Sequence, residues 1–85
     1  MEALIKIGSA EAGDTLNEMK SRGLQFEVSS IQEDIEEGDA YSEAIIDVPN
    51  VQIFINELKT KYDESPIDFL IGVDDQNDND VFWEA

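Results

Sequence analysis

Carboxylates are the most abundant reactive side chains in this chain, with 21 aspartates and glutamates against 5 lysines and arginines. Two carboxylates can perform acid–base catalysis when they occupy different environments within a cleft. The chain has no histidine and no cysteine, so neither an imidazole base nor a thiolate nucleophile is available. A glycine-rich phosphate loop and a nucleophile motif are also absent from the sequence. These residue types predict a protein that is not an enzyme and uses no cofactor.

One acidic run has part of the oxygen spacing of a calcium-binding loop. Asp74, Gln76 and Asp78 occupy alternate positions, as the first ligands of an EF-hand do. Asn79 stands where such a loop needs glycine, and Ala85 stands where its twelfth position needs glutamate. The run therefore does not predict a dedicated metal site.

The excess of carboxylates gives a formal net charge of −16 over 85 residues. A surface of this sign repels nucleic acid and anionic membranes and attracts basic protein surfaces. The sequence shows neither the pattern of a signal peptide nor the roughly 18 consecutive apolar residues of a membrane span. We therefore expect a cytoplasmic protein whose partner is a basic protein, and we expect it to bind neither nucleic acid nor membranes.

Apolar residues make up 41% of the chain and recur with the periods of strands and helices, which predicts one folded domain over residues 1–85. Ser9 and Asn50 are the expected helix N-caps. The charged segment 32–39 is predicted to be a hairpin loop. The expected elements are a strand over 3–7, a helix over 10–22, strands over 24–28 and 41–48, a helix over 51–62, a strand from 66 to 73 and a short strand over 81–83.

This order predicts an α+β protein with the ferredoxin-like βαββαβ fold: an antiparallel sheet, two helices on one of its faces, and a short C-terminal strand. Same-face residues on a strand are about 6.7 Å apart and neighbouring strands about 4.8 Å apart. Carboxylates on the uncovered face would therefore form a grid with a spacing comparable to that of the charges on duplex DNA. Alternation assigns to that face Lys6, Glu27, Glu43, Asp47, Asp68 and Asp74.

The acidic hairpin and this grid together define the expected partner-binding surface, with Tyr41 as an aromatic anchor. A hairpin tip that only keeps the protein soluble is an alternative interpretation of the same acidic segment. Phe82 and Trp83 are expected either to close the core or to make the contact of a homodimer. The predicted partner-binding residues are Glu27, Glu33, Asp34, Glu36, Glu37, Asp39, Tyr41, Glu43, Asp47, Asp68, Asp74 and Asp75.

In its size, its acidity and its lack of catalytic residues, the chain resembles the small DNA-mimic inhibitors that bacteriophages encode. Such proteins occupy the DNA channel of restriction enzymes, CRISPR effectors, repair glycosylases, recombination nucleases or nucleoid proteins. The resemblance implies a non-enzymatic anti-defence inhibitor that binds a basic DNA-binding protein in the host cytoplasm. It rests on composition along the whole chain and on no motif, so no functional residue is carried over.

Two other functions are compatible with the sequence. The first is a small acidic regulatory or adaptor domain that binds a protein through a sheet edge or through a helix residue such as Ile53. The second is a protein from a salt-adapted organism, in which an acidic surface is a general property.

Overall fold

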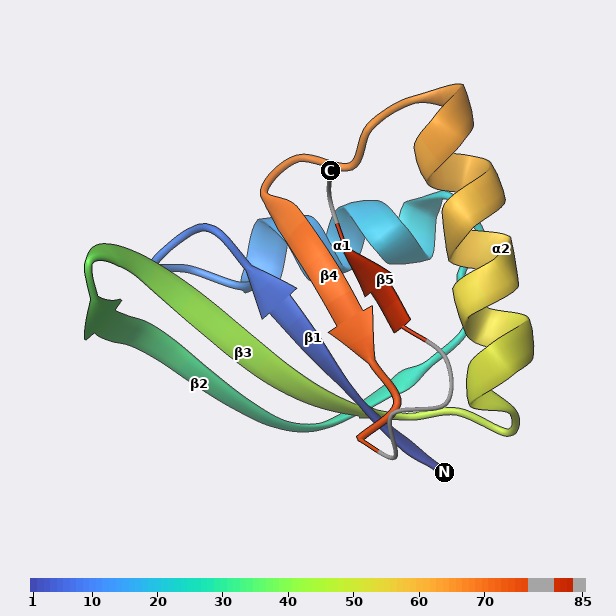
Figure 1. The fold of residues 1–85 in the computed structure, drawn as a ribbon, viewed down its shortest axis with the longest axis horizontal. Coiled ribbons are helices and arrows are strands. Elements are labelled where there is room, and N and C mark those ends of the chain that lie inside the picture. Colours follow the sequence, from blue (N-terminus) through green and yellow to red (C-terminus); the bar gives the residue numbers. More distant parts are fainter. Residues whose placement is uncertain (77–80, 84–85) are drawn as a thin grey trace.

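The computed structural model describes residues 1–76 and 81–83, apart from the side chain of Glu37. The elements form one five-stranded antiparallel sheet, ordered β2-β3-β1-β4-β5, with two helices (Figure 1). The expected α+β class is therefore confirmed. In chain order the elements are β1 (Glu2–Ile7), α1 (Gly13–Ser21), β2 (Glu27–Glu37), β3 (Asp39–Asp47), α2 (Val51–Glu64), β4 (Leu70–Asp74) and β5 (Val81–Trp83).

One continuous hydrophobic core joins the sheet to both helices. In Figure 1, α1 crosses behind the strands and α2 runs along the side near β4 and β5. The other face of β1 and β3, which is turned toward the viewer in Figure 1, carries no described helix and is called the open face below. The inward residues of β1 and β3 belong to the same buried cluster as residues of both helices, namely Ala3, Ile5, Ile7, Ala44, Ile46, Leu16, Met19, Phe54, Ile55 and Leu58.

Helix α2 forms as its sequence predicts. The side chain of Asn50 accepts a hydrogen bond from the backbone N–H of Ile53 (3.0 Å), which satisfies one of the free donors at the start of the helix. The apolar residues at helical spacing face the core, while Ile53 is 59% exposed on the opposite side.

Helix α1 is shorter than predicted, because Ser9 does not cap it. The Ser9 hydroxyl accepts a hydrogen bond from the Glu11 backbone within the preceding loop (3.2 Å). At the helix start, the N–H of Ala12 donates instead to a Glu33 carboxylate oxygen (2.8 Å). This cap comes from β2, 21 residues away in the chain, so local sequence patterns could not reveal it.

The prediction of a loop over residues 32–39 is wrong. β2 continues through this acidic segment to Glu37, and the chain reverses at Gly38, whose φ of 78° suits glycine. The pairing register shifts twice along β2, once between Val28 and Ser30 and again between Gln32 and Ile35. Pairing with β3 therefore overrides the low strand propensity of the charged residues.

β4 begins at Leu70 rather than at residue 66, which corrects the expected register of this strand. The alternation of the expected strand would place Phe69 on the same side as Val73, but Phe69 has a φ of 65° and is 62% exposed. Its carbonyl oxygen accepts a hydrogen bond from the N–H of Gly8 (2.6 Å), which holds the corner before the strand. The first residues of the expected strand therefore form a turn.

The expected short strand over 81–83 is confirmed, and it pairs with β4. Phe82 lies opposite Val73 and meets the ring of Tyr62 edge to face, with the ring centroids 5.0 Å apart. Trp83 lies opposite Gly72 and is 47% exposed. The alternation within β5 thus gives Phe82 to the core and leaves Trp83 partly in solvent.

Candidate acidic protein-binding surface

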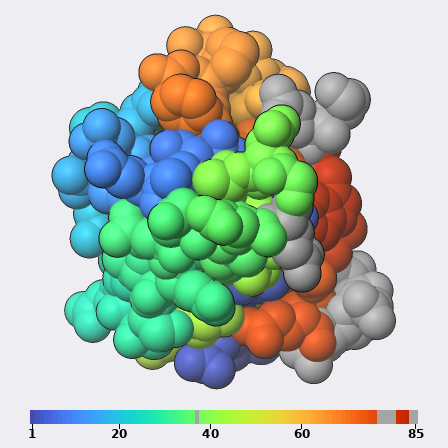
Figure 2. Space-filling view, turned by 90° about the vertical axis from the view of Figure 1, so that its left-hand side faces the viewer, coloured from blue at the N-terminus to red at the C-terminus, as the bar shows by residue number. Residues whose placement is uncertain are grey.

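The β2–β3 hairpin, from Glu27 to Asp47, is rich in negative charge and contains no base of its own. Its residues occupy the centre of one side of the molecule (Figure 2). Half of the formal net charge of −16 lies in this segment, because it contains eight carboxylates and no lysine or arginine. The eight are Glu27, Glu33, Asp34, Glu36, Glu37, Asp39, Glu43 and Asp47.

The outward side chains of β3 alternate between carboxylates and larger, less polar groups. Ala44 and Ile46 are buried on the core side, so their neighbours in the strand face the other way. Consecutive outward positions are about 6.7 Å apart, so consecutive carboxylates along the strand are about 13 Å apart. The outward series in chain order is Asp39, Tyr41, Glu43, Ile45 and Asp47.

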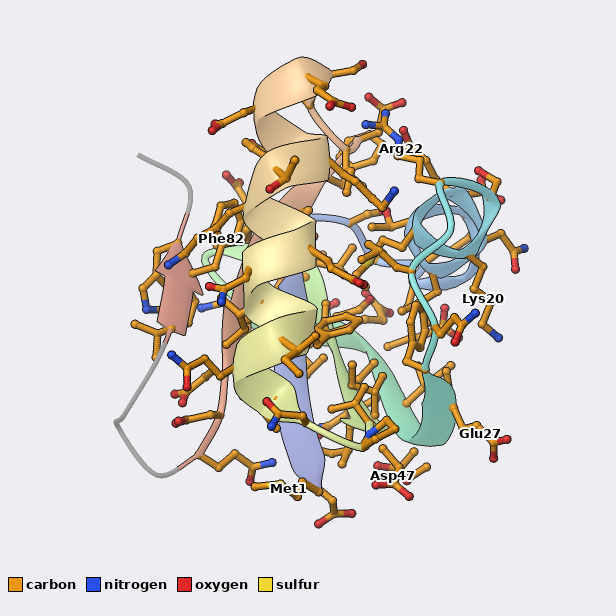
Figure 3. All side chains as sticks on the ribbon, turned by 90° about the vertical axis from the view of Figure 1, so that its right-hand side faces the viewer. Met1, Lys20, Arg22, Glu27, Asp47 and Phe82 are labelled. Atoms are coloured by element: carbon orange, nitrogen blue, oxygen red, sulfur yellow. The ribbon has the colours of Figure 1, made fainter. Side chains whose placement is uncertain are left out.

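Three acidic residues lie in register on adjacent strands at the end of the open face where β3 finishes. Asp47 pairs with Glu27 of β2 on one side and with Glu2 of β1 on the other. Figure 3 shows Glu27, Asp47 and Met1 at this end of the molecule. An Asp47 oxygen accepts a hydrogen bond from the Met1 amine (2.8 Å), which offsets part of the repulsion between like charges on adjacent strands.

Glu43 occupies the middle of the open face, between Gln32 of β2 and Lys6 of β1. The Lys6 ammonium lies 4.6 Å from the centre of the Tyr41 ring, a cation–π geometry. Within the described part of the chain, no basic side chain forms an ion pair with Glu27, Asp39 or Glu43. These carboxylates are therefore able to meet cationic groups of a partner.

Two of the predicted binding residues also make contacts within the fold. Glu33 caps α1 through the N–H of Ala12 (2.8 Å), so one of its carboxylate oxygens is already engaged. The backbone N–H of Asp34 donates to the Ala10 carbonyl (3.1 Å), and Asp34 has a φ of 54° within the second register shift of β2. Together these contacts attach the hairpin to the loop before α1.

The acids of the hairpin tip divide between its two sides. Asp39 is exposed on the side of Tyr41 and Glu43, whereas Glu36 lies opposite Ala40 and is exposed on the other side. Glu37 pairs with Asp39 along the backbone, and its side chain lies outside the described residues. The tip therefore presents carboxylates in two directions.

The structure separates the predicted residues near the C-terminus. Asp74 lies on the open face opposite Leu4, and its carboxylate accepts a hydrogen bond from the N–H of Gln76 (2.7 Å). Asp68 lies in the turn before β4, where its N–H donates to Glu18 (3.0 Å), so its placement on the grid was wrong. Asp75 is only 7% exposed and cannot contribute to an accessible grid.

The helical layer differs from the hairpin because it contains most of the basic residues. Arg22 forms an ion pair with Glu18 (2.6 Å) and donates to the carbonyl oxygens of Ser65 and Pro66. Figure 3 shows Lys20 and Arg22 on the α1 side of the molecule. The remaining bases outside the sheet, Lys59 and Lys61, belong to α2.

Sequence reasoning missed the apolar residues that lie between the acids on the open face. Ile45 pairs with Leu4 of β1, and Tyr41 pairs with Ile35 of β2. Each of the four is only partly buried. The alternation over residues 39–47 contained this signal, because assigning Ala44 and Ile46 to the core assigns Ile45 to the opposite face.

Among the described residues, no group of three or more acidic side chains is arranged to hold a metal ion. Asp78, which completes the calcium-like spacing, lies outside the described residues. None of the described helices combines the length and the apolar character that crossing a bilayer requires.

The fold and the surface together define a small α+β domain in which one β-hairpin carries a concentrated negative charge. Comparison with protein-family models, with curated proteins and with solved structures finds no match to this chain.

Proposed function

We propose that this protein is a non-enzymatic inhibitor that imitates the charge of DNA and occupies the DNA-binding surface of a basic protein. The β2–β3 hairpin is the proposed contact. The partner contributes lysine and arginine side chains that would otherwise bind phosphates. A restriction enzyme, a CRISPR effector, a repair glycosylase, a nuclease or a nucleoid protein of a phage host would each provide such a surface.

The separation of charge between the hairpin and the helical layer carries this proposal. Eight carboxylates without a base occupy the hairpin, whereas four of the five basic residues lie in or directly after the helices. Residues 63–85 are another stretch with eight carboxylates and no base, so a lack of bases alone does not single out the hairpin. The hairpin differs because antiparallel pairing fixes its outward acids on one face of the sheet.

Pairing of a partner through a sheet edge is less well supported. The edge strand β2 has two register shifts, and its second irregular segment is hydrogen-bonded to Ala10. The opposite edge strand, β5, has only three residues. Irregular and short edges are features by which proteins avoid strand addition, so the hairpin side chains are the better candidates for the contact.

We also assign the ferredoxin-like arrangement to this domain, with β5 as an added strand. The order β2-β3-β1-β4 supports this assignment, as do the two helices that follow β1 and β3 in the chain. The arrangement accounts for the open face, because both helices then cover the same side of the sheet.

The proposal is tested by displacement of duplex DNA. Fluorescein-labelled duplex is bound to each member of a panel of basic DNA-binding proteins that contains a restriction endonuclease, a CRISPR nuclease, a repair glycosylase and a nucleoid protein. We expect the chain to displace the duplex from at least one member. With about four cationic contacts, its affinity should fall on the order of 100-fold between about 50 mM and about 200 mM salt.

Either of two results would overturn the proposal. One is failure to displace the duplex from every member of the panel at low salt. The other is binding to a panel member with an affinity that does not change with salt concentration, because a contact made by carboxylates must weaken as the charges are screened.

A further inference from the structure

The open face has a feature that a DNA backbone lacks: apolar pairs lie between its carboxylates. Along β3, the pair Tyr41–Ile35 lies between the levels of Asp39 and Glu43, and the pair Ile45–Leu4 lies between the levels of Glu43 and Asp47. We call these two cross-strand pairs the apolar bands. They are defined by Ile35 and Tyr41, and by Leu4 and Ile45.

All four residues of the apolar bands are partly accessible rather than buried. They lie on the side of the sheet opposite Ile5, Ala44 and Ile46, which belong to the core shared with both helices. No described element of the chain covers this side of β1 and β3. Apolar area that remains half-exposed on a sheet loses contact with water when a partner covers it, and this favours binding.

Charge determines which kind of partner fits this face. The carboxylates of Glu2, Glu27 and Asp47 flank the Leu4–Ile45 band on its side away from Glu43. Asp39 flanks the Ile35–Tyr41 band on its side away from Glu43. A second copy of the chain would bring the same charges together, which disfavours self-association. A complementary partner carries lysine or arginine side chains at the levels of the acids and apolar side chains between them.

We propose that the apolar bands select the partner among basic proteins, by docking the apolar side chains that lie between its lysines and arginines. This inference rests on the proposed function and adds a contact that does not depend on salt. The carboxylates attract the partner and give the salt-dependent part of the affinity. The apolar bands contribute a factor that stays constant as the charges are screened, and a phosphate backbone offers no equivalent.

The test is a substitution of Ile45 measured against the same substitution of Ile31. Ile31 is 46% exposed on the same hairpin, but it pairs with Ala44 and so lies on the other side of the sheet. The probe is the panel protein from which the chain displaces labelled duplex. We expect Ile45→Thr to weaken binding by about 5- to 10-fold, the equivalent of one to two buried methylene groups. The same factor is expected at about 50 mM and about 200 mM salt.

The Ile31→Thr variant should bind like the unmodified chain at both salt concentrations. Circular dichroism shows whether each variant is folded, and Ile35→Thr replaces Ile45→Thr if the latter unfolds. If the folded variant of an apolar band (Ile45→Thr, or Ile35→Thr in its place) bound as tightly as the unmodified chain, this inference would be overturned and the proposed function would remain intact. An equal loss in the band variant and in Ile31→Thr would also overturn it. Failure of the unmodified chain to displace duplex from any panel member would instead overturn the proposed function.

Discussion

The β2–β3 hairpin and the two helices contrast sharply in how they distribute charge. The helices contain five carboxylates and three lysines between them, whereas the hairpin contains eight carboxylates and no base. Both regions are exposed to the same solvent and attached to the same core. The hairpin acids therefore lack the bases that accompany the acids of the helices, as do the eight acids of residues 63–85.

The hairpin also differs from the helices in how its charges are held. The helix carboxylates other than Glu18 lie at exposed positions of the two helices. The hairpin acids on β3 are fixed four residues apart by antiparallel pairing with β1 and β2. Because the strands define these positions in the free protein, binding of the proposed partner would cost little ordering free energy.

A change at the opposite edge of the sheet tests whether binding is confined to the hairpin. A Cβ atom at Gly72 would clash with the Trp83 ring and with the Phe82 carbonyl oxygen. We therefore expect Gly72→Ala to lower the free energy of unfolding by about 1–3 kcal/mol by displacing β5. Urea denaturation followed by Trp83 fluorescence measures this loss.

Gly13→Ala is the control for this substitution, because nothing lies within 4 Å of the added atom. It should leave stability unchanged or raise it by up to about 1 kcal/mol, since alanine favours the helix. Both variants should still displace duplex DNA while they are folded. If Gly72→Ala alone failed to displace duplex DNA while folded, the binding surface would include β5 and the assignment to the hairpin would be wrong.

A single acid of the hairpin is expected to stabilise the fold rather than bind the partner. Glu33→Ala removes the carboxylate that accepts from the Ala12 N–H (2.8 Å), so the start of α1 loses its cap. We expect the free energy of unfolding to fall by about 1 kcal/mol, the usual cost of losing a cap. Thermal denaturation followed by circular dichroism measures the change.

Glu36→Ala is the matched control for the cap, because Glu36 is exposed on the same strand and makes no described hydrogen bond. It should leave stability within about 0.5 kcal/mol of the unmodified chain. If the two alanine variants were equally stable, the proposed division of roles within the hairpin would be wrong.

The smallest expected effect concerns repulsion among the hairpin acids. Asp39→Asn should raise stability by a few tenths of a kcal/mol at low salt, because Asp39 lies opposite Glu37 in a segment that has no base. The gain should disappear near 1 M salt, where the screening length falls to about 3 Å. Differential scanning calorimetry at the two salt concentrations measures it, and a gain that persists in high salt would exclude repulsion as its cause.

Much of the fold could be predicted, because its apolar residues recur with clear periods. The helix over 51–62, its Asn50 cap and the strand over 41–48 were all predicted from the sequence and are confirmed, with β3 beginning two residues earlier. The α+β class followed from the order of these elements. Regular local patterns were therefore sufficient wherever the chain follows its local preferences.

The errors arose where distant contacts decide local structure. The segment 32–39 is too charged to suggest a strand, yet pairing with β3 extends β2 to Glu37. The α1 cap comes from Glu33, which no pattern near Ser9 could indicate. Phe69 has a left-handed backbone conformation, and β4 begins only after it, at Leu70. Asp68 therefore lies in the preceding turn and not on the open face.

The acidic surface was only partly predictable for the same reason. The outward positions of Glu27, Glu43, Asp47 and Asp74 followed from alternation and are confirmed by the pairing register. The burial of Asp75 depends on the residues packed around the end of β4, which the sequence does not reveal. The binding role of the acids remains a prediction.

The most direct test compares two triple variants with the same change in charge. One neutralises the hairpin with Glu27→Gln, Asp39→Asn and Glu43→Gln, and the other neutralises α2 with Glu57→Gln, Asp63→Asn and Glu64→Gln. The measurement is the affinity of each variant for the panel protein from which the unmodified chain displaces duplex DNA, at about 50 mM salt. We predict a loss on the order of 100-fold for the hairpin variant, about 1 kcal/mol per lost contact, and less than about 3-fold for the α2 variant. Equal losses in the two variants would contradict the account, because only the total charge would then matter.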